Sequence, residues 1–236
     1  SADNTLTSTI GYYYASSKSL FFKDSVVLVN PRYTMRGDTL KYVVNAERAF
    51  FFGPTFIEAD SNLIYCENGW YDTKNDISRF GKNAYLQNES QFLYADTLFY
   101  DRNKGYGKGQ ENITVWDTVE LLKVKGQFAE MFELKDETYI TDSVLVEKYM
   151  EEDTFFLHSD TLLLCKDSSG KHNIIRSYFN SRTYNKSLQS RCDSLVYNFK
   201  DSLISLFGRP VAWFENYQVS GKFMQLHTND SEITEM

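Results

Sequence analysis

The sequence predicts an all-β fold built from repeated strand-turn-strand units, and three observations support this prediction. Tyr (17) and Phe (18) are abundant, whereas the 236 residues include only 3 Pro and 12 Gly. Almost no stretch has a helical period. A five-residue phrase, Asp-(Thr/Ser)-Leu-X-(Tyr/Leu), recurs along the chain, which indicates stacked units that bury their apolar faces against neighbours. We therefore expect one long domain over residues 1–236, which could form part of a longer chain.

The recurring phrase is the first predicted element. It occurs at residues 38–42, 96–100, 160–164 and 193–197, with a version carrying one extra residue at 60–65. The interval from Asp96 to Asp160 is close to twice that from Asp160 to Asp193, so we expect a degenerate unit at Asp142–Val146. Asp followed by Thr or Ser favours a turn. The Leu and Tyr two residues apart then lie on one side of the following strand.

Two further elements recur between the phrases. A polar turn precedes a short apolar strand at residues 23–29, 109–115 and 208–213, and a glycine-centred strand pair occurs at 124–128 and 219–223. The segment Phe52–Ile57 is similar to Phe207–Ala212. Turn signals about 8 to 12 residues apart are typical of a roll of many short antiparallel strands.

Charge and hydropathy exclude several classes of partner. The net charge of −7 disfavours nucleic acid, because neutralising phosphates requires clustered Lys and Arg. No run approaches the roughly 18 apolar residues that cross a bilayer, and the chain does not begin with a secretory leader. We therefore expect neither a nucleic-acid partner nor a transmembrane helix.

The reactive side chains do not form a recognisable catalytic set. His158, His172 and His227 are far apart and lack the spacing of metal-ligand pairs. The sequence has no Gly-X-Ser-X-Gly motif and no phosphate-binding loop. We expect no enzymatic activity, no catalytic residue, no metal and no cofactor.

The three cysteines do not suggest a disulfide framework. Cys66 and Cys165 each follow a phrase leucine by three residues, which predicts equivalent places in the repeat, too far apart for a bond. We interpret Cys66, Cys165 and Cys192 as free, mostly buried thiols.

Several motifs resemble one known family. Ala95–Asp101 reads Ala-Asp-Thr-Leu-Phe-Tyr-Asp and is followed by Glu111–Val115, Glu-Asn-Ile-Thr-Val. Ile64–Thr73 and Arg209–Trp213, with Gln218–Gly221 behind it, add to the pattern. These motifs resemble the OstA-like superfamily, of the LptA and LptD periplasmic-domain type, and in particular its larger Bacteroidetes-type members. The resemblance extends from about residue 8 to the end of the chain.

The resemblance implies a fold and a function. The fold is an elongated antiparallel β-jellyroll, or β-taco, whose apolar interior shields lipid acyl chains. The implied function is that of a periplasmic protein which binds lipopolysaccharide or a related lipid and transports it toward the outer membrane. Implied partners are other β-roll transport domains, joined end to end. Head-to-tail self-association is expected near Val26–Val29 at one end and Phe223–Leu226 at the other.

The paired positions of the repeat give the candidate lipid-binding residues. The residues expected to line a shared apolar groove are Leu98, Tyr100, Ile113, Val115, Leu162, Leu164, Leu195 and Tyr197. Two alternatives remain open: a β-solenoid enzyme that acts on polysaccharide through an outer groove, and a structural envelope module with a filled core. A roomy hollow behind the phrase residues would favour transport, and a filled core would favour the alternatives.

Overall fold

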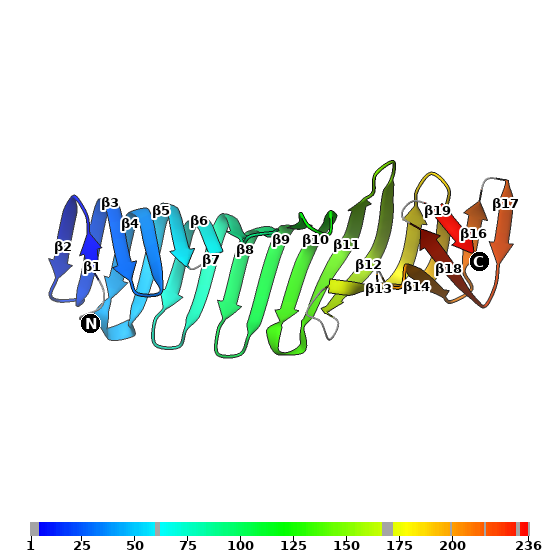
Figure 1. Ribbon diagram of the computed structural model, residues 1–236. Coiled ribbons are helices and arrows are strands. Elements are labelled where there is room, and N and C mark those ends of the chain that lie inside the picture. The colour runs from blue at the N-terminus through cyan, green and yellow to red at the C-terminus, as the bar shows by residue number, and fades with distance from the viewer. Residues whose placement is uncertain are drawn as a thin grey trace. The chain divides into compact units, whose positions relative to one another are not determined.

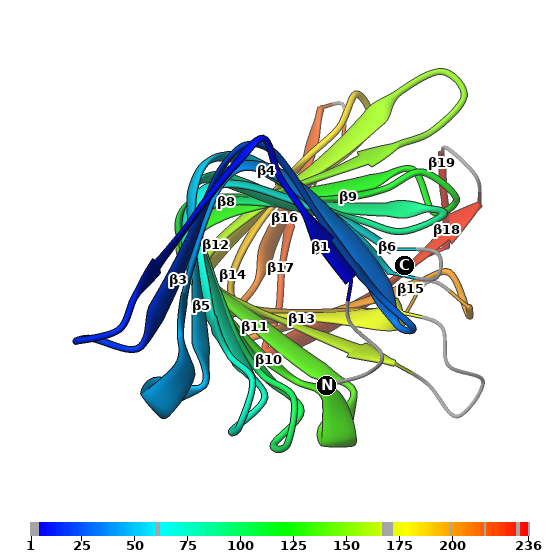
Figure 2. The same cartoon turned by 90° about the vertical axis from the view of Figure 1, so that its left-hand side faces the viewer.

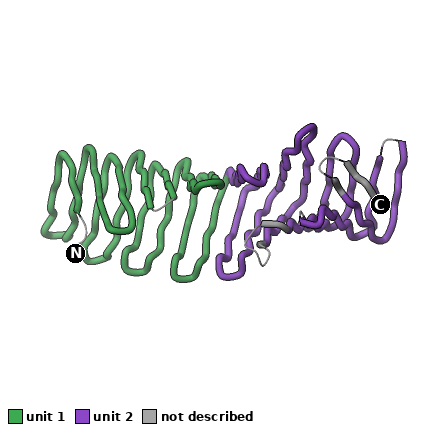
Figure 3. Tube along the Cα trace, viewed as in Figure 1, with its two compact units in different colours: residues 1–111 green, residues 112–236 purple. Residues whose placement is uncertain are grey.

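The computed structural model describes residues 5–59, 62–166, 172–198, 200–214, 216–229 and 232–235. The chain forms two compact units, residues 1–111 and residues 112–236 (Figure 3). Both units consist almost entirely of antiparallel β-strands, which confirms the all-β prediction. One domain over residues 1–236 stays a prediction. Within the described ranges, no helix is both long and apolar enough to cross a membrane.

In the first unit, strands that follow one another in sequence pair side by side (Figure 1). Its elements are β1 Thr5–Thr7, β2 Ile10–Tyr14, β3 Ser19–Asn30, β4 Tyr33–Val43, the 3-10 turn η1 Val44–Ala46, β5 Arg48–Ala59, β6 Asn62–Asp72, β7 Ile77–Gln87 and β8 Gln91–Asp101. The next strand, β9 Tyr106–Asp117, includes the boundary between the units. One half of β3 pairs with β1 and the other half pairs with β2.

The second unit continues the same pattern until its strands become short. Its elements are β10 Leu122–Phe132, the 3-10 turn η2 Glu133–Lys135, β11 Glu137–Tyr149, β12 Thr154–Lys166, β13 His172–Tyr184, β14 Gln189–Asn198, β15 Leu203–Phe207, β16 Val211–Phe214, β17 Tyr217–Ser220, β18 Phe223–Asn229 and β19 Glu232–Glu235. The strand β14 pairs with β15 along one half and with β16 along the other. Two short strands, β15 and β16, therefore take the place that one long bent strand occupies elsewhere in the chain.

The long strands bend in the middle, where their register is interrupted. In alternate strands two consecutive residues have positive φ, the left-handed conformation that side chains other than glycine rarely adopt. These pairs are Asp24–Ser25, Lys82–Asn83, Glu111–Asn112, Asp142–Ser143 and Phe179–Asn180. Where the pairing is resolved, such a pair faces a single residue of the next strand, as in a β-bulge. A bulge bends its strand, so within each unit these bulges bend the strands at positions that the cross-strand pairing aligns.

The aspartates of the recurring phrase are those single residues. Asp38, Asp96, Asp160 and Asp193 lie inside strands opposite the positive-φ pairs. The prediction that the phrase begins with a turn between strands is therefore wrong. The neighbouring hydroxyl explains the second position of the phrase, because Ser194 Oγ donates to Asp193 Oδ2 at 2.7 Å. Across the strands, Asn180 Nδ2 donates to Asp160 Oδ2 at 2.8 Å.

We call the bend in each strand a corner and the single residue opposite a positive-φ pair the corner residue. The corner positions change the definition of the repeat. Asp142 and Ser143 are a positive-φ pair opposite Asp160, so the prediction of a degenerate phrase at Asp142–Val146 is wrong. The corner place is taken by Glu67 in β6 and by Gln127 in β10. Asp60 and Ser61, from the phrase with one extra residue, lie outside the described residues. The repeat is thus a pair of strands, and acidic and amide side chains share one corner place.

Strand edges differ from the expected docking segments. Val27–Val29 pairs with β1 on one side and with β4 on the other, so the expectation of an open edge there is wrong. By its described pairings, β2 has β3 as its one neighbour, and its Tyr12, Tyr13 and Tyr14 are more than half exposed. Phe223–Leu226 pairs with β15 on one side, and among the described residues no strand pairs with its other side.

The corner geometry predicts a strong cost for a side chain at Gly208, whose φ is +77°. A Cβ there would lie 2.3 Å from Asp193 Cβ. We expect Gly208→Ala to destabilise the protein by more than the roughly 1–2 kcal/mol of the left-handed conformation alone, measured as a lower urea midpoint. Gly11→Ala is the matched control, because a Cβ there would make an ordinary 3.5 Å contact with Phe22. Equal midpoints for the two variants would contradict the corner assignment.

Candidate functional site

The bend divides the sheet of the first unit into two arms (Figure 2). We call the strand halves joined by the loops 44–47, 73–76 and 102–105 the first arm, and those joined by 31–32 and 88–90 the second arm. Because side chains alternate between the faces of a strand, each arm has one inner face, which carries the buried residues, and one outer face.

The inner face of the second arm carries a continuous row of aliphatic side chains. Cross-strand pairing aligns Leu28, Met35, Ile57, Ile64, Leu86 and Leu93, one from each of six neighbouring strands. We call this set the aliphatic row. Met35 is only 2% exposed, whereas the other five side chains are half-buried. The row is therefore an apolar strip that keeps partial access to solvent.

The inner face of the first arm is more polar. Pairing aligns Leu20, Tyr42, Ala49, Tyr71, Ser78 and Tyr100, which we call the tyrosine row. The Tyr71 hydroxyl donates to Asp76 Oδ1, and burial together with this bond raises the pKa of Tyr71. Burial also raises the pKa of Tyr33, a second-arm residue that interacts electrostatically with Tyr42 of the tyrosine row. The hydroxyls of Tyr33 and Tyr71 are therefore protonated at neutral pH.

Between the arms, large side chains pack onto small ones. Phe51 and Leu98 are 4% and 8% exposed, and the residues flanking the corner on the second arm are small, as at Cys66, Ala84 and Ala95. Larger residues in these places would hold the two arms apart. We call this set of buried residues beside the corners the packed crease. Of the predicted groove residues, Leu98 belongs to the packed crease of the first unit, and Tyr100 belongs to the tyrosine row.

The second unit gathers four of the other predicted residues. Leu162 and Leu195 share one cross-strand row through Ser177, and Leu164 and Tyr197 share the next row. All four are at most 9% exposed. The remaining two lie on β9, where Ile113 is 1% exposed and Val115 is half-buried. A groove shared by all eight residues stays a prediction.

The interior of the second unit is closed at these positions. The Phe155 ring packs edge-on against Tyr197, with ring centres 5.6 Å apart, from the opposite half of the bent strands. Buried hydroxyls bond to one another nearby: Ser177 Oγ and Ser181 Oγ lie 2.7 Å apart, and Thr183 Oγ1 and Ser190 Oγ lie 2.6 Å apart. The leucines of the phrase fill a core here, as the structural alternative predicts for this unit.

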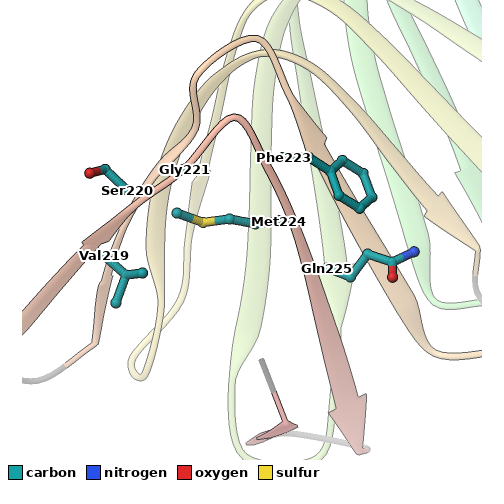
Figure 4. A pocket seen from close by; sticks show the side chains of 6 residues that line it. All are labelled: Val219, Ser220, Gly221, Phe223, Met224 and Gln225. Atoms are coloured by element: carbon teal, nitrogen blue, oxygen red, sulfur yellow. The ribbon is translucent and has the colours of Figure 1, made fainter.

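Two shallow pockets lie in the second unit, and neither is lined by the eight predicted residues. One is formed by Val219–Gly221 and Phe223–Gln225. Figure 4 shows Phe223 and Gln225 on one side of β18 and Met224 on the other. The second pocket lies at a corner and includes Asn180, Arg191 and Arg209.

No group of three or more His, Cys, Asp or Glu side chains that could hold a metal occurs in the described residues. His158 and His227 are exposed and lie on different strands. The side chain of His172 is outside the described set. The expectation that the protein is not an enzyme stays a prediction.

Sequence reasoning missed the aliphatic row. Its members alternate with outward-facing residues, as in Ile64-Tyr65-Cys66 and Leu93-Tyr94-Ala95. This period of two was the available signal. It was hidden because the outward positions carry aromatic rings, which contact one another from Phe56 through Tyr65 and Tyr85 to Tyr94.

Comparisons with known proteins identify a family and a similar solved structure. A family model described as OstA-like protein matches residues 1–39 and 36–148. The chain is similar to the crystal structure of LptH, the LptA homologous periplasmic component of the lipopolysaccharide transport device from Pseudomonas aeruginosa. The identity is 14%, the TM-score is 0.39, and the match covers 42% of this chain and 75% of that chain. A search of curated proteins found no match.

The corner positions show which cysteines occupy equivalent places in the repeat, and the pair differs from the one predicted from the sequence. Cys66 precedes the corner residue Glu67, and Cys192 precedes Asp193, so these two are equivalent, and the predicted equivalence of Cys66 and Cys165 is wrong. All three are free, as predicted. Burial raises the pKa of both Cys66 and Cys192 to about 12.

We therefore expect Cys66 and Cys192 to resist alkylation by iodoacetamide in the folded protein, because the thiolate is the reactive form. Half-buried Cys165 should react first. Peptide mass spectrometry after timed labelling, with a urea-unfolded sample as the control, measures the three rates. Modification of Cys66 as fast as Cys165 under native conditions would contradict the packed crease.

Proposed function

The chain belongs to the OstA-like protein family, and we propose that it is a periplasmic protein that binds lipopolysaccharide or a related lipid and transports it toward the outer membrane. The family match confirms the resemblance seen in the motifs. The observation that carries the proposal is the aliphatic row of the first unit, whose half-buried side chains lie on an inner face.

The length and chemistry of the aliphatic row suit an acyl chain. Six strands at about 4.8 Å spacing make the row roughly 24 Å long. Burying apolar surface yields about 25 cal/mol per Å², or about 0.8 kcal/mol per methylene. An acyl chain lying along the row would cover side chains that are otherwise partly exposed, so both the lipid and the protein would lose contact with water.

The tyrosine row gives this site a polar side. Tyr42, Tyr71 and Tyr100 lie on the first arm and present rings with hydroxyl groups. Rings with a polar end are suited to a boundary between apolar and wet surroundings. We propose that acyl chains contact the aliphatic row and that the hydroxyls face the polar part of the same molecule.

The filled core of the second unit indicates a structural role for that unit. Its phrase residues Leu162 and Leu195 are fully buried, and Phe155 packs on Tyr197 across the interior. This observation favours a structural role for that core, in line with the alternative of a filled module. Lipid binding is therefore proposed for the first unit. The other six predicted residues, Ile113, Val115, Leu162, Leu164, Leu195 and Tyr197, would line the predicted groove only in a conformation in which the two halves of the second unit's strands separate.

The aliphatic row yields a direct test by crosslinking. With a photo-crosslinking amino acid at Leu86, we expect capture of purified lipopolysaccharide, because this side chain lies on the inner face. Tyr85 is the matched control, since it is adjacent in sequence and points to the outer face, where its ring contacts Tyr65 and Tyr94. Mass spectrometry of the adducts gives the ratio. Equal capture at both positions, or capture only at Leu162, would refute the proposed site.

We also propose that the chain associates end to end through its open strand edges, β2 and Phe223–Leu226, since unpaired edges accept another strand. Light scattering over a range of protein concentrations should show a mass that grows with concentration. Tyr12→Lys with Tyr14→Lys should reduce this growth, because charged residues blunt edges. Tyr94→Lys, on a strand outside these edges, is the control. One fixed monomeric mass at all concentrations would exclude self-association.

A further inference from the structure

The outer face of the second unit carries a row of basic side chains. Cross-strand pairing places His158 of β12 opposite Arg182 of β13, and Arg182 opposite Arg191 of β14. All three are exposed and alternate with buried residues, such as Leu157, so they point outward. We call His158, Arg182 and Arg191 the basic row.

The direct opposition of Arg182 and Arg191 is unfavourable for the sheet. Like charges on directly opposed residues destabilise a strand pair. No ion pair offsets this cost, because the ion pairs formed within the described ranges involve other residues. Asp160 and Asp193 lie two residues from His158 and Arg191 on the same strands; they accept hydrogen bonds from Asn180 and Ser194, and neither takes part in an ion pair within the described ranges.

The surroundings add two observations. Arg191 also lines the corner pocket together with Arg209, a second exposed guanidinium, and with the Asp193 carboxylate. Because this pocket has two guanidinium groups and one carboxylate, the charged groups that line it have a net positive charge. This excess occurs in a chain of net charge −7, so it does not follow from composition.

Aromatic side chains, two of them exposed, lie on the same face two residues further along the strands. Phe156 and Tyr184 are opposite each other with ring centres 6.4 Å apart. Trp213 is opposite Gln189 on the neighbouring pair. Tyr184 and Trp213 are 54% and 39% exposed. Guanidinium groups beside exposed rings are a combination suited to the polar boundary of a lipid.

We propose that the basic row binds the phosphate group of a lipid headgroup. Guanidinium groups bind phosphate through paired, charge-assisted hydrogen bonds. The Cβ atoms of directly opposed residues are about 4.5–5.5 Å apart, so Arg182 and Arg191 can contact one phosphate together. The bound anion removes the repulsion between them. The lipid as the source of the phosphate rests on the proposed function, whereas the anion site rests on the basic row alone.

The test measures binding of the full chain to vesicles by co-sedimentation. The vesicles contain phosphatidylcholine alone, phosphatidylcholine with phosphatidic acid, or phosphatidylcholine with oleic acid, which supplies negative charge without phosphate. We expect the protein to prefer phosphatidic acid, with binding that weakens as salt rises. Arg182→Gln with Arg191→Gln should reduce binding about 30-fold, at the usual strength of an arginine near an anionic surface.

A matched control removes the same charge elsewhere. Arg36→Gln with Arg79→Gln, two exposed residues of the first unit, should change binding less than twofold. The melting temperature of the Arg182→Gln, Arg191→Gln variant should be unchanged or higher, because the opposed charges are gone. Lipid capture at Leu86 should persist in this variant, so a failure of the anion site is distinguishable from a failure of the proposed function.

Several results would overturn the proposal. Equal binding to oleic acid and phosphatidic acid vesicles would show a charge effect without phosphate recognition. Displacement by inorganic phosphate at the same phosphate concentration as the lipid would assign the site to the free anion. Binding of polyglutamate in preference to any vesicle would assign it to an acidic protein. Unchanged binding of the Arg182→Gln, Arg191→Gln variant would exclude the basic row.

Discussion

The bend in the middle of each long strand is the constraint on which the rest of the structure depends. Two left-handed residues such as Lys82 and Asn83 face one corner residue such as Asp96. Non-glycine residues in this conformation carry a conformational cost, and hydrogen bonds such as that from Asn83 Nδ2 to Glu67 at 2.8 Å offset part of it. Within each unit, cross-strand pairing aligns the corners of neighbouring strands, so the strands of that unit bend at matching positions.

The corners dictate which residues can lie beside them. Small side chains occupy the inside of the crease, as at Cys66 and Ala95, and their few polar members bond to the backbone freed by the bulge. Ser159 Oγ, for example, donates to the Thr161 carbonyl at 3.1 Å. Away from the crease the two units differ: the first unit keeps a half-buried aliphatic row, whereas Phe155 and Tyr197 close the second. The same β-bulge at the corner therefore occurs in a unit with a partly accessible interior and in a unit with a filled interior.

Strand alternation separates the chemistry of the two faces. In the first unit the inner face carries the aliphatic row and the tyrosine row, and in the second unit the outer face of β12 to β14 carries the opposed Arg182 and Arg191. The apolar strip of the first unit is proposed to contact acyl chains, and the opposed arginines of the second unit are proposed to bind a phosphate, each within its own unit. Each face can change without the other, since a substitution at one position leaves its alternating neighbour in place.

The sequence alone determined the all-β class, the recurrence of a unit and the family resemblance, because aromatic alternation and the Asp-Thr-Leu phrase are local signals. It also predicted that Leu98, Leu162 and Leu195 line a shared interior; all three are buried, and the shared groove stays a prediction. It could not place Asp96 in a corner rather than a turn, since both use the same acceptor chemistry and only the opposite strand distinguishes them. Nor could it find the aliphatic row or the opposition of Arg182 and Arg191. Those depend on the register between strands, which is set by the hydrophobic pattern and the turn geometry of paired strands together and is visible only in the folded sheet.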